Sequence, residues 1–195
     1  MEPPRQGDLF RTAATLYLVL AVCGVVWIGW REQGVPWRLF VDPAWWWLDL
    51  LLGAATALLI LGVWQVVRRL VPLASELEGR LRDLLGAVRR EEAIGLALLS
   101  GVAEEVFFRG AVQPSWGYPL ATVLFAVLHT GRGRAMWLWT AAALFAGALL
   151  GGLMLWRGTL LAPIVAHFLV NAIQLDRLLT AAPATDEETA SPDGD

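Results

Sequence analysis

The sequence contains no lysine and only one cysteine. All 15 basic residues of the 195-residue chain are therefore arginines. The single cysteine, Cys23, lies inside an apolar run, so neither an internal disulfide nor a thiolate metal site is available. A catalytic cysteine requires a polar, cation-rich setting, which the residues around Cys23 do not provide. We interpret Cys23 as a packing residue.

Charge of either sign is also scarce. Only 17% of the residues are charged, 57% are hydrophobic and the mean hydropathy is +0.56. Soluble domains have about a quarter of their residues charged, so this composition predicts a membrane protein. Five of the 18 acidic residues lie in the last ten positions. The net charge of −3 thus reflects an acidic tail, residues 181–195, which we expect to be disordered.

Long apolar runs dominate the rest of the chain. Runs long enough to cross a bilayer occur at 12–30, 45–67, 92–113, 135–155 and 159–179. A sixth run, 119–130, is too short to cross alone, so we expect a helix that is buried in the bundle or completed by its flanks. Residues 73–91 place their leucines on one stripe, which predicts an amphipathic helix at the membrane interface. The predicted fold is all-α: a polytopic membrane bundle of about six helices, one short, plus this interfacial helix.

The arginines predict the orientation and the division of the chain. Eleven lie in the segments that six spans place with the two termini, and three lie on the opposite side. The positive-inside rule then puts both termini in the cytoplasm, and we expect a bacterial inner (plasma) membrane. We divide the chain into a two-span region with the amphipathic helix (1–91), a helical core (92–180) and the tail. Asp49, at the start of the second span, is explained by an interfacial position.

Three charged residues lie inside the span 92–113. Each would cost about 2.5–3.5 kcal/mol near the bilayer centre on insertion scales. Glu105 and Arg109 are four residues apart, so a helix brings them together as an ion pair. Glu104 is rotated by ~100° from that pair and has no local partner. A buried glutamate of this kind provides the setting that a general base needs.

The other polar residues at membrane depth are His129, His167 and Asn171. They fall on the short helix and on the last span, close in sequence to apolar neighbours. Polar groups at this depth turn toward a shared interior, so we predict that these three residues meet Glu104. Ser100 lacks the G-x-S-G context of rhomboid-like proteases. The sequence also lacks H-E-x-x-H and the G-x-G-D and Y-D pairs of aspartyl intramembrane proteases.

Three motifs carry a resemblance to a known family. EEVFFR (Glu104–Arg109), FAVLH (Phe125–His129) and HFLVN (His167–Asn171) resemble the E-E-x-x-x-R, F-x-x-x-H and H-x-x-x-N/D pattern of the CPBP family. These are the CAAX-protease-2-like and bacteriocin-processing membrane enzymes, also called Abi proteins. The resemblance covers about residues 92–177, and it is specific because the order and spacing of all three motifs agree.

The resemblance implies an intramembrane endopeptidase. Glu104 would activate a water with His129, and His167 and Asn171 would stabilise the oxyanion. Glu105 and Arg109 would hold the helix and orient Glu104, and Phe125 would support the site. The preferred hypothesis requires no cofactor. A metalloprotease with Zn²⁺ on Glu104, His129 and His167 is the alternative that the sequence leaves open.

Two other classes of function compete with the protease. A non-catalytic membrane scaffold or immunity protein would keep the motifs only for packing, and a transporter would use the same polar cluster for ions or protons. The chain is shorter than CAAX-processing members, so we expect peptide maturation, self-immunity or signalling rather than prenyl-protein processing. The expected partners are membrane lipid and a peptide or membrane-protein substrate, and no nucleic acid.

Overall fold

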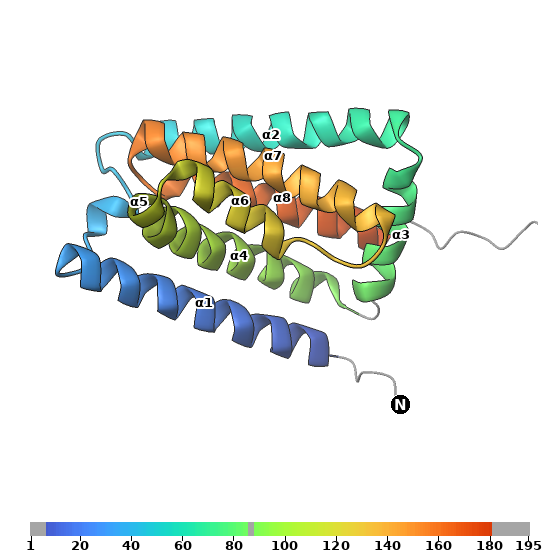
Figure 1. The fold of residues 1–195 in the computed structure, drawn as a ribbon, viewed down its shortest axis with the longest axis horizontal. Helices are drawn as coiled ribbons and strands as arrows, with labels where there is room; N and C mark the ends of the chain where they lie inside the picture. The colour runs from blue at the N-terminus through green and yellow to red at the C-terminus, as the bar shows by residue number, and fades with distance from the viewer. Residues whose placement is uncertain (1–6, 86–87, 181–195) are drawn as a thin grey trace, which may run out of the picture.

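A computed structural model describes residues 7–85 and 88–180, and every regular element in these ranges is helical (Figure 1). The predicted all-α fold is confirmed, whereas the acidic tail lies outside the described residues. The elements are α1 (Asp8–Glu32), η1 (Trp37–Leu39), α2 (Trp46–Leu70), α3 (Leu73–Leu85), α4 (Arg90–Glu105), η2 (Val106–Val112), α5 (Gln113–Trp116), α6 (Tyr118–Leu128), α7 (Arg134–Arg157) and α8 (Leu161–Thr180).

The long helices run side by side, and α3 crosses one end of the bundle (Figure 1). α8 packs against both α2 and α4, while α1 covers α4 from the other side. By length and composition, α1, α2 and α7 are able to cross a membrane among the described helices. Their outward faces expose large apolar side chains, among them Leu16, Val26, Leu58 and Leu155. Such a surface is suited to lipid, and the chain is an integral membrane protein.

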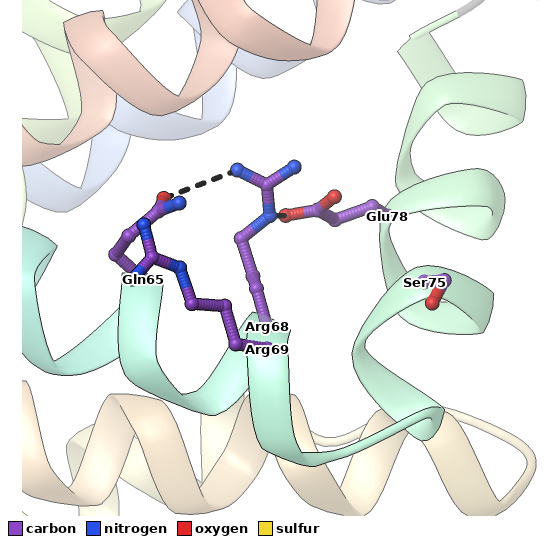
Figure 2. Close-up of a pocket in the computed structure, with 5 residues that line it drawn as sticks. All are labelled: Gln65, Arg68, Arg69, Ser75 and Glu78. Carbon is purple, nitrogen blue, oxygen red and sulfur yellow. Dashed lines mark hydrogen bonds and ion pairs between the residues drawn. The ribbon is translucent and has the colours of Figure 1, made fainter.

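The amphipathic helix predicted over 73–91 is confirmed as α3, but it ends at Leu85, and residues 90 and 91 belong to α4. Leu77 is fully buried against Ala135 and Met136 at the start of α7, while the opposite face is polar. Where α3 joins α2, Arg68 pairs with Glu78 at 2.8 Å and donates to Gln65 (Figure 2). These contacts and the neighbouring Arg69 and Ser75 form a small polar pocket at the corner. The position of α3 at the membrane interface stays a prediction.

The short helix α6 places His129 part-way along the bundle. Its eleven residues cover ~16 Å, whereas the 24 residues of α7 beside it cover ~36 Å. The non-helical segment 129–133 bridges the remaining distance, as we expected of a short helix completed by its flank. Its carbonyl groups are held by Thr140, which donates to His129 O, and by Arg80 of α3, which donates to Arg132 O.

Asp49 differs from our interpretation. It is completely buried, accepts hydrogen bonds from Arg157 Nε and Thr159 Oγ1 and thereby joins α2 to the end of α7. The carboxylate is therefore stabilised by a cation on another helix, which our interpretation did not include, and its interfacial position stays a prediction. Sequence spacing gave no sign of this pair because its members are 108 residues apart.

Close contact between α4 and α8 sets the depth at which their polar residues meet. A Cβ on Gly101 would lie 3.1 Å from the backbone nitrogen of Phe168, the residue that follows His167. Small residues allow membrane helices to approach this closely. Gly101 therefore brings the end of α4, with its two glutamates, to the level of His167.

We expect Gly101→Leu to reduce the free energy of unfolding by about 1–3 kcal/mol, because the added side chain overlaps a backbone that cannot move aside. Gly62→Leu on α2 is the matched control, since an added Cβ there meets nothing within 4 Å. Thermal unfolding of the purified proteins in detergent compares them. Equal unfolding midpoints for the Gly101 variant and the wild type would contradict the packing argument.

Candidate active site

The two adjacent glutamates lie where the helix changes its hydrogen-bonding pattern. α4 ends at Glu105 and continues without a break into the π-helical segment η2. π-Helical turns inside α-helices are rare and occur frequently at functional sites. The wider turn leaves carbonyl groups available, and Arg31 of α1 donates to two of them, Gly110 O at 3.1 Å and Ala111 O at 2.9 Å. The first helix thus holds the segment that carries Arg109.

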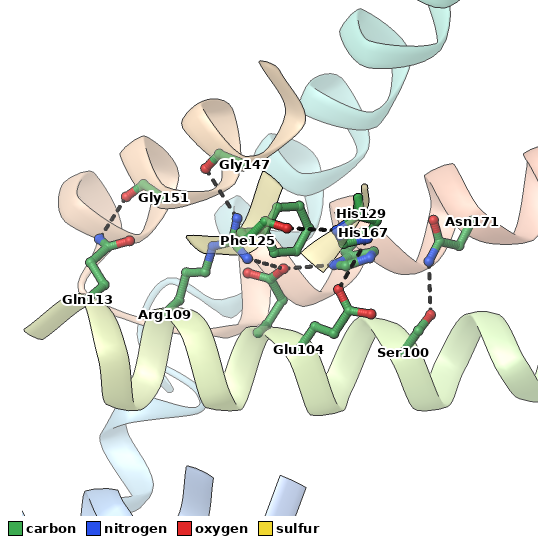
Figure 3. Close-up of polar contacts among 11 residues, drawn as sticks. Ser100, Glu104, Arg109, Gln113, Phe125, His129, Gly147, Gly151, His167 and Asn171 are labelled. Carbon is green, nitrogen blue, oxygen red and sulfur yellow. Dashed lines mark hydrogen bonds and ion pairs between the residues drawn. The ribbon is translucent and has the colours of Figure 1, made fainter. Parts of the chain in front are cut away.

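The predicted Glu105–Arg109 pair is confirmed and is almost completely buried. Arg109 Nη1 donates to Glu105 Oε1 at 3.1 Å, and its Nη2 donates to the carbonyl of Gly147 on α7 (Figure 3). The guanidinium also lies over the ring of Phe125, 4.3 Å from its centroid, which adds a cation–π contact. One arginine therefore links α4, α6 and α7.

His167 is a partner of Glu105 and not of Glu104. Its Nδ1 lies 2.7 Å from Glu105 Oε1, the same oxygen that Arg109 contacts. A carboxylate paired with arginine only accepts hydrogen bonds, so Nδ1 must be the protonated nitrogen that donates. This contact fixes the ring and leaves Nε2 for other interactions. The arrangement resembles the carboxylate–histidine pairs that orient imidazoles in many active sites.

Glu104 faces His129. The two side chains approach to 3.7 Å between Glu104 Oε2 and His129 Nε2, which is longer than a hydrogen bond. His129 Nδ1 lies 2.8 Å from the carbonyl of Phe125, and because a carbonyl only accepts, Nδ1 is the donor. In the neutral ring Nε2 is then an acceptor. Glu104 Oε2 is buried and has no hydrogen-bond partner among the described residues.

Two proton acceptors, Glu104 Oε2 and His129 Nε2, thus face each other. A molecule with two O–H bonds, such as water, is able to donate one hydrogen to Glu104 Oε2 and the other to His129 Nε2. Glu104 is buried and the side chain of His129 is partly exposed, so the site is reached from the side of α6. This is the geometry that a pair of groups activating water requires.

Asn171 reaches the cluster through a serine. It lies one turn beyond His167 on α8, and its Nδ2 donates to Ser100 Oγ at 2.8 Å (Figure 3). Ser100 itself donates to the carbonyl of Ala97. Ser100 lies one helical turn before Glu104. This i, i+4 spacing is the feature of the sequence that would have predicted a role for Ser100 beside Glu104. The structure brings Glu104 and His129 together directly, and it connects His167 and Asn171 to them through Glu105 and Ser100.

The positions of Glu104, His129 and His167 do not support the zinc alternative. Within residues 7–85 and 88–180, no three or more His, Cys, Asp and Glu side chains are grouped so that they could hold a metal ion. His167 Nδ1 is bound to Glu105 and His129 Nδ1 to a backbone carbonyl, so Nε2 is the nitrogen that each ring would offer to a metal. As they lie, the side chains of the described residues form no zinc site, and the metalloprotease alternative stays a prediction.

Comparison with known proteins gives the family. Residues 92–173 match the family described as type II CAAX prenyl endopeptidase Rce1-like. These residues run from the first turn of α4 into α8 and contain Glu104, His129, His167 and Asn171. Residues 92–173, the CPBP core, are thus similar to this endopeptidase family over less than half of the chain.

A bacterial protein is also similar to part of the chain. The uncharacterized protein YpbD of Bacillus subtilis (strain 168) is 39% identical over 80 residues, which are 41% of this chain and 42% of YpbD. The chain therefore spans less than half the length of this relative. No solved structure matches the chain significantly.

We expect Glu105→Gln to reduce the free energy of unfolding by about 3–5 kcal/mol, because it leaves the buried Arg109 charge without its partner. Glu76→Gln is the matched control. Glu76 and Arg80 form an i, i+4 pair of similar length, 2.9 Å, but both side chains are nearly half exposed. Loss of such a surface pair costs about 0–1 kcal/mol. Chemical or thermal unfolding in detergent measures both, and equal losses would show that burial does not strengthen the pair.

Proposed function

We propose that the protein is an intramembrane endopeptidase that cleaves a peptide or membrane-protein substrate at or in the membrane. Glu104 and His129 activate the attacking water. The observation that carries this proposal is the convergence of two acceptors, Glu104 Oε2 and His129 Nε2, 3.7 Å apart. The membership of residues 92–173 in a protease family supports it independently.

In the proposed reaction, Glu104 is the general base. It removes a proton from water as the water oxygen attacks the scissile carbonyl, and it later gives this proton to the leaving amine. His129 accepts the second hydrogen bond of the water and orients it. The carbonyl of Phe125, which holds His129 Nδ1, keeps Nε2 directed toward Glu104.

The oxyanion that forms on the carbonyl needs hydrogen-bond donors. Asn171 Nδ2 carries two N–H bonds, and only one of them is given to Ser100. The second is available for an oxyanion. His167 would donate from Nε2 when both of its nitrogens carry protons, while Nδ1 remains on Glu105. The Glu105–Arg109 pair holds these groups in place and takes no part in proton transfer.

A scaffold or immunity protein does not explain this arrangement as well. Helix packing would be served by Glu105, Arg109 and His167, which bind one another. It gives no reason for a second buried carboxylate, Glu104, whose Oε2 faces His129 at 3.7 Å and makes no hydrogen bond with the residues that the structure describes. Glu104 is therefore the residue whose substitution separates the two functions.

We expect Glu104→Gln to lower the rate of cleavage by a factor of about 10²–10⁴, because the amide cannot accept a proton from water. Glu91→Gln, on the exposed first turn of the same helix, is the matched control and should cleave normally. The assay uses purified protein in detergent and a panel of membrane-proximal peptides, with and without a prenyl group, each with and without a zinc chelator.

Each outcome of this assay has a definite meaning. Wild-type cleavage that resists the chelator and disappears in Glu104→Gln supports glutamate-activated water. Loss of wild-type activity with the chelator supports the metal alternative. If wild type and Glu104→Gln cleave equally, the proposed role of Glu104 is wrong.

We also propose that both termini face the cytoplasm of a bacterial inner (plasma) membrane, as the arginine distribution indicates. Because the chain has one cysteine, Cys23→Ala provides a background for single-cysteine labelling. Val35→Cys, between α1 and α2, should react with a membrane-impermeant maleimide in spheroplasts. Ser75→Cys on α3 should react only after permeabilisation. The opposite pattern would reverse the orientation.

A further inference from the structure

Tyr17 lies on the face of α1 that packs against α4. Phe10, Tyr17 and Gly24 are spaced by seven residues, close to two helical turns, and so share this face. The ring of Phe10 lies 3.2 Å from where a Cβ on Gly95 would be, and a Cβ on Gly24 would lie 3.0 Å from the backbone of Phe107. Tyr17 is thus held beside the part of α4 between these two contacts, which contains Glu104.

This register places Tyr17 opposite the part of α4 that carries Ser100 and Glu104, and its hydroxyl lies within the electrostatic influence of both. Ser100 also accepts the hydrogen bond from Asn171. A line of polar groups therefore runs from Asn171 on α8 through Ser100 on α4 and Tyr17 on α1 to Glu104. Tyr17 is the member of this line that comes from outside the CPBP core, since the family match begins at residue 92.

We propose that Tyr17 is a positioning residue for the general base. It donates its O–H to the Glu104 carboxylate and thereby keeps the other oxygen directed at His129. A buried carboxylate needs donors to offset the loss of water, and the known motifs supply Glu104 with none. This inference rests on the proposed function. It gives α1 a part in the active site in addition to its support of the π-helical segment.

The chain's other tyrosine provides a matched control. Tyr118 donates to the carbonyl of Ala148 on α7 at 2.8 Å, a contact that serves helix packing. Tyr17→Phe and Tyr118→Phe each remove one hydroxyl and keep the ring. If Tyr17 acts through Glu104, the two variants must differ in catalysis although their chemistry is the same.

The first experiment measures kcat, KM and the unfolding midpoint of both variants with the peptide that the wild type cleaves best. We expect Tyr17→Phe to lower kcat by about 10- to 100-fold with KM unchanged, as a misplaced catalytic group does. Tyr118→Phe should lower the unfolding midpoint and keep kcat. A Tyr17→Phe variant with wild-type kcat, while Glu104→Gln is inactive, would overturn this inference and leave the proposed function intact.

A second experiment requires no substrate. The unfolding midpoints of wild type, Tyr17→Phe, Glu104→Leu and the double variant form a thermodynamic cycle. If the hydroxyl is bound to the carboxylate, Tyr17→Phe lowers the midpoint of the wild type but does not lower that of Glu104→Leu. Additive shifts would show that the two residues do not interact, and would overturn the inference even if no peptide is cleaved.

Discussion

The buried carboxylate of Glu105 is the interaction on which the rest of the site depends. One of its oxygens contacts both Arg109 and His167. Arg109 extends the connection to the carbonyl of Gly147 on α7 and to the ring of Phe125 on α6. A single anion thus ties together α4, α6, α7 and α8. In a bilayer no water is available to replace these contacts, so the charges hold the helices in one arrangement.

Close approach of the helix backbones makes these contacts possible. Gly101 allows α4 to approach the backbone of α8, and a Cβ on Gly147 would lie 3.0 Å from the ring of Phe125. The π-helical turn after Glu105 is stabilised by Arg31, which binds its carbonyl groups from α1. Apolar packing alone gives membrane helices little specificity, because lipid tails are as apolar as the side chains. Polar contacts and small residues therefore set the rotation of each helix.

The two adjacent glutamates have different surroundings. One oxygen of Glu105 binds a cation and a histidine, whereas Glu104 makes neither contact within the described part of the chain, and its buried Oε2 faces His129 across 3.7 Å. Adjacent positions on a helix point ~100° apart, so neighbouring residues of the same type enter different surroundings. The first helix lies outside the CPBP core, yet its Arg31 binds carbonyl groups of the π-helical segment, and its Tyr17 is the residue that we propose positions Glu104.

The sequence by itself determined the helices, because the bilayer requires apolar runs whose length it sets. It also determined the Glu105–Arg109 pair, whose members lie four apart on one helix, and the three motifs of the family. Only the tertiary structure decided that His167 binds Glu105 and that Asn171 binds Ser100. The contact in which Arg157 donates to Asp49 was likewise decided by the tertiary structure. Contacts between helices depend on their rotation and axial offset, and hydrophobic periodicity within one helix fixes neither.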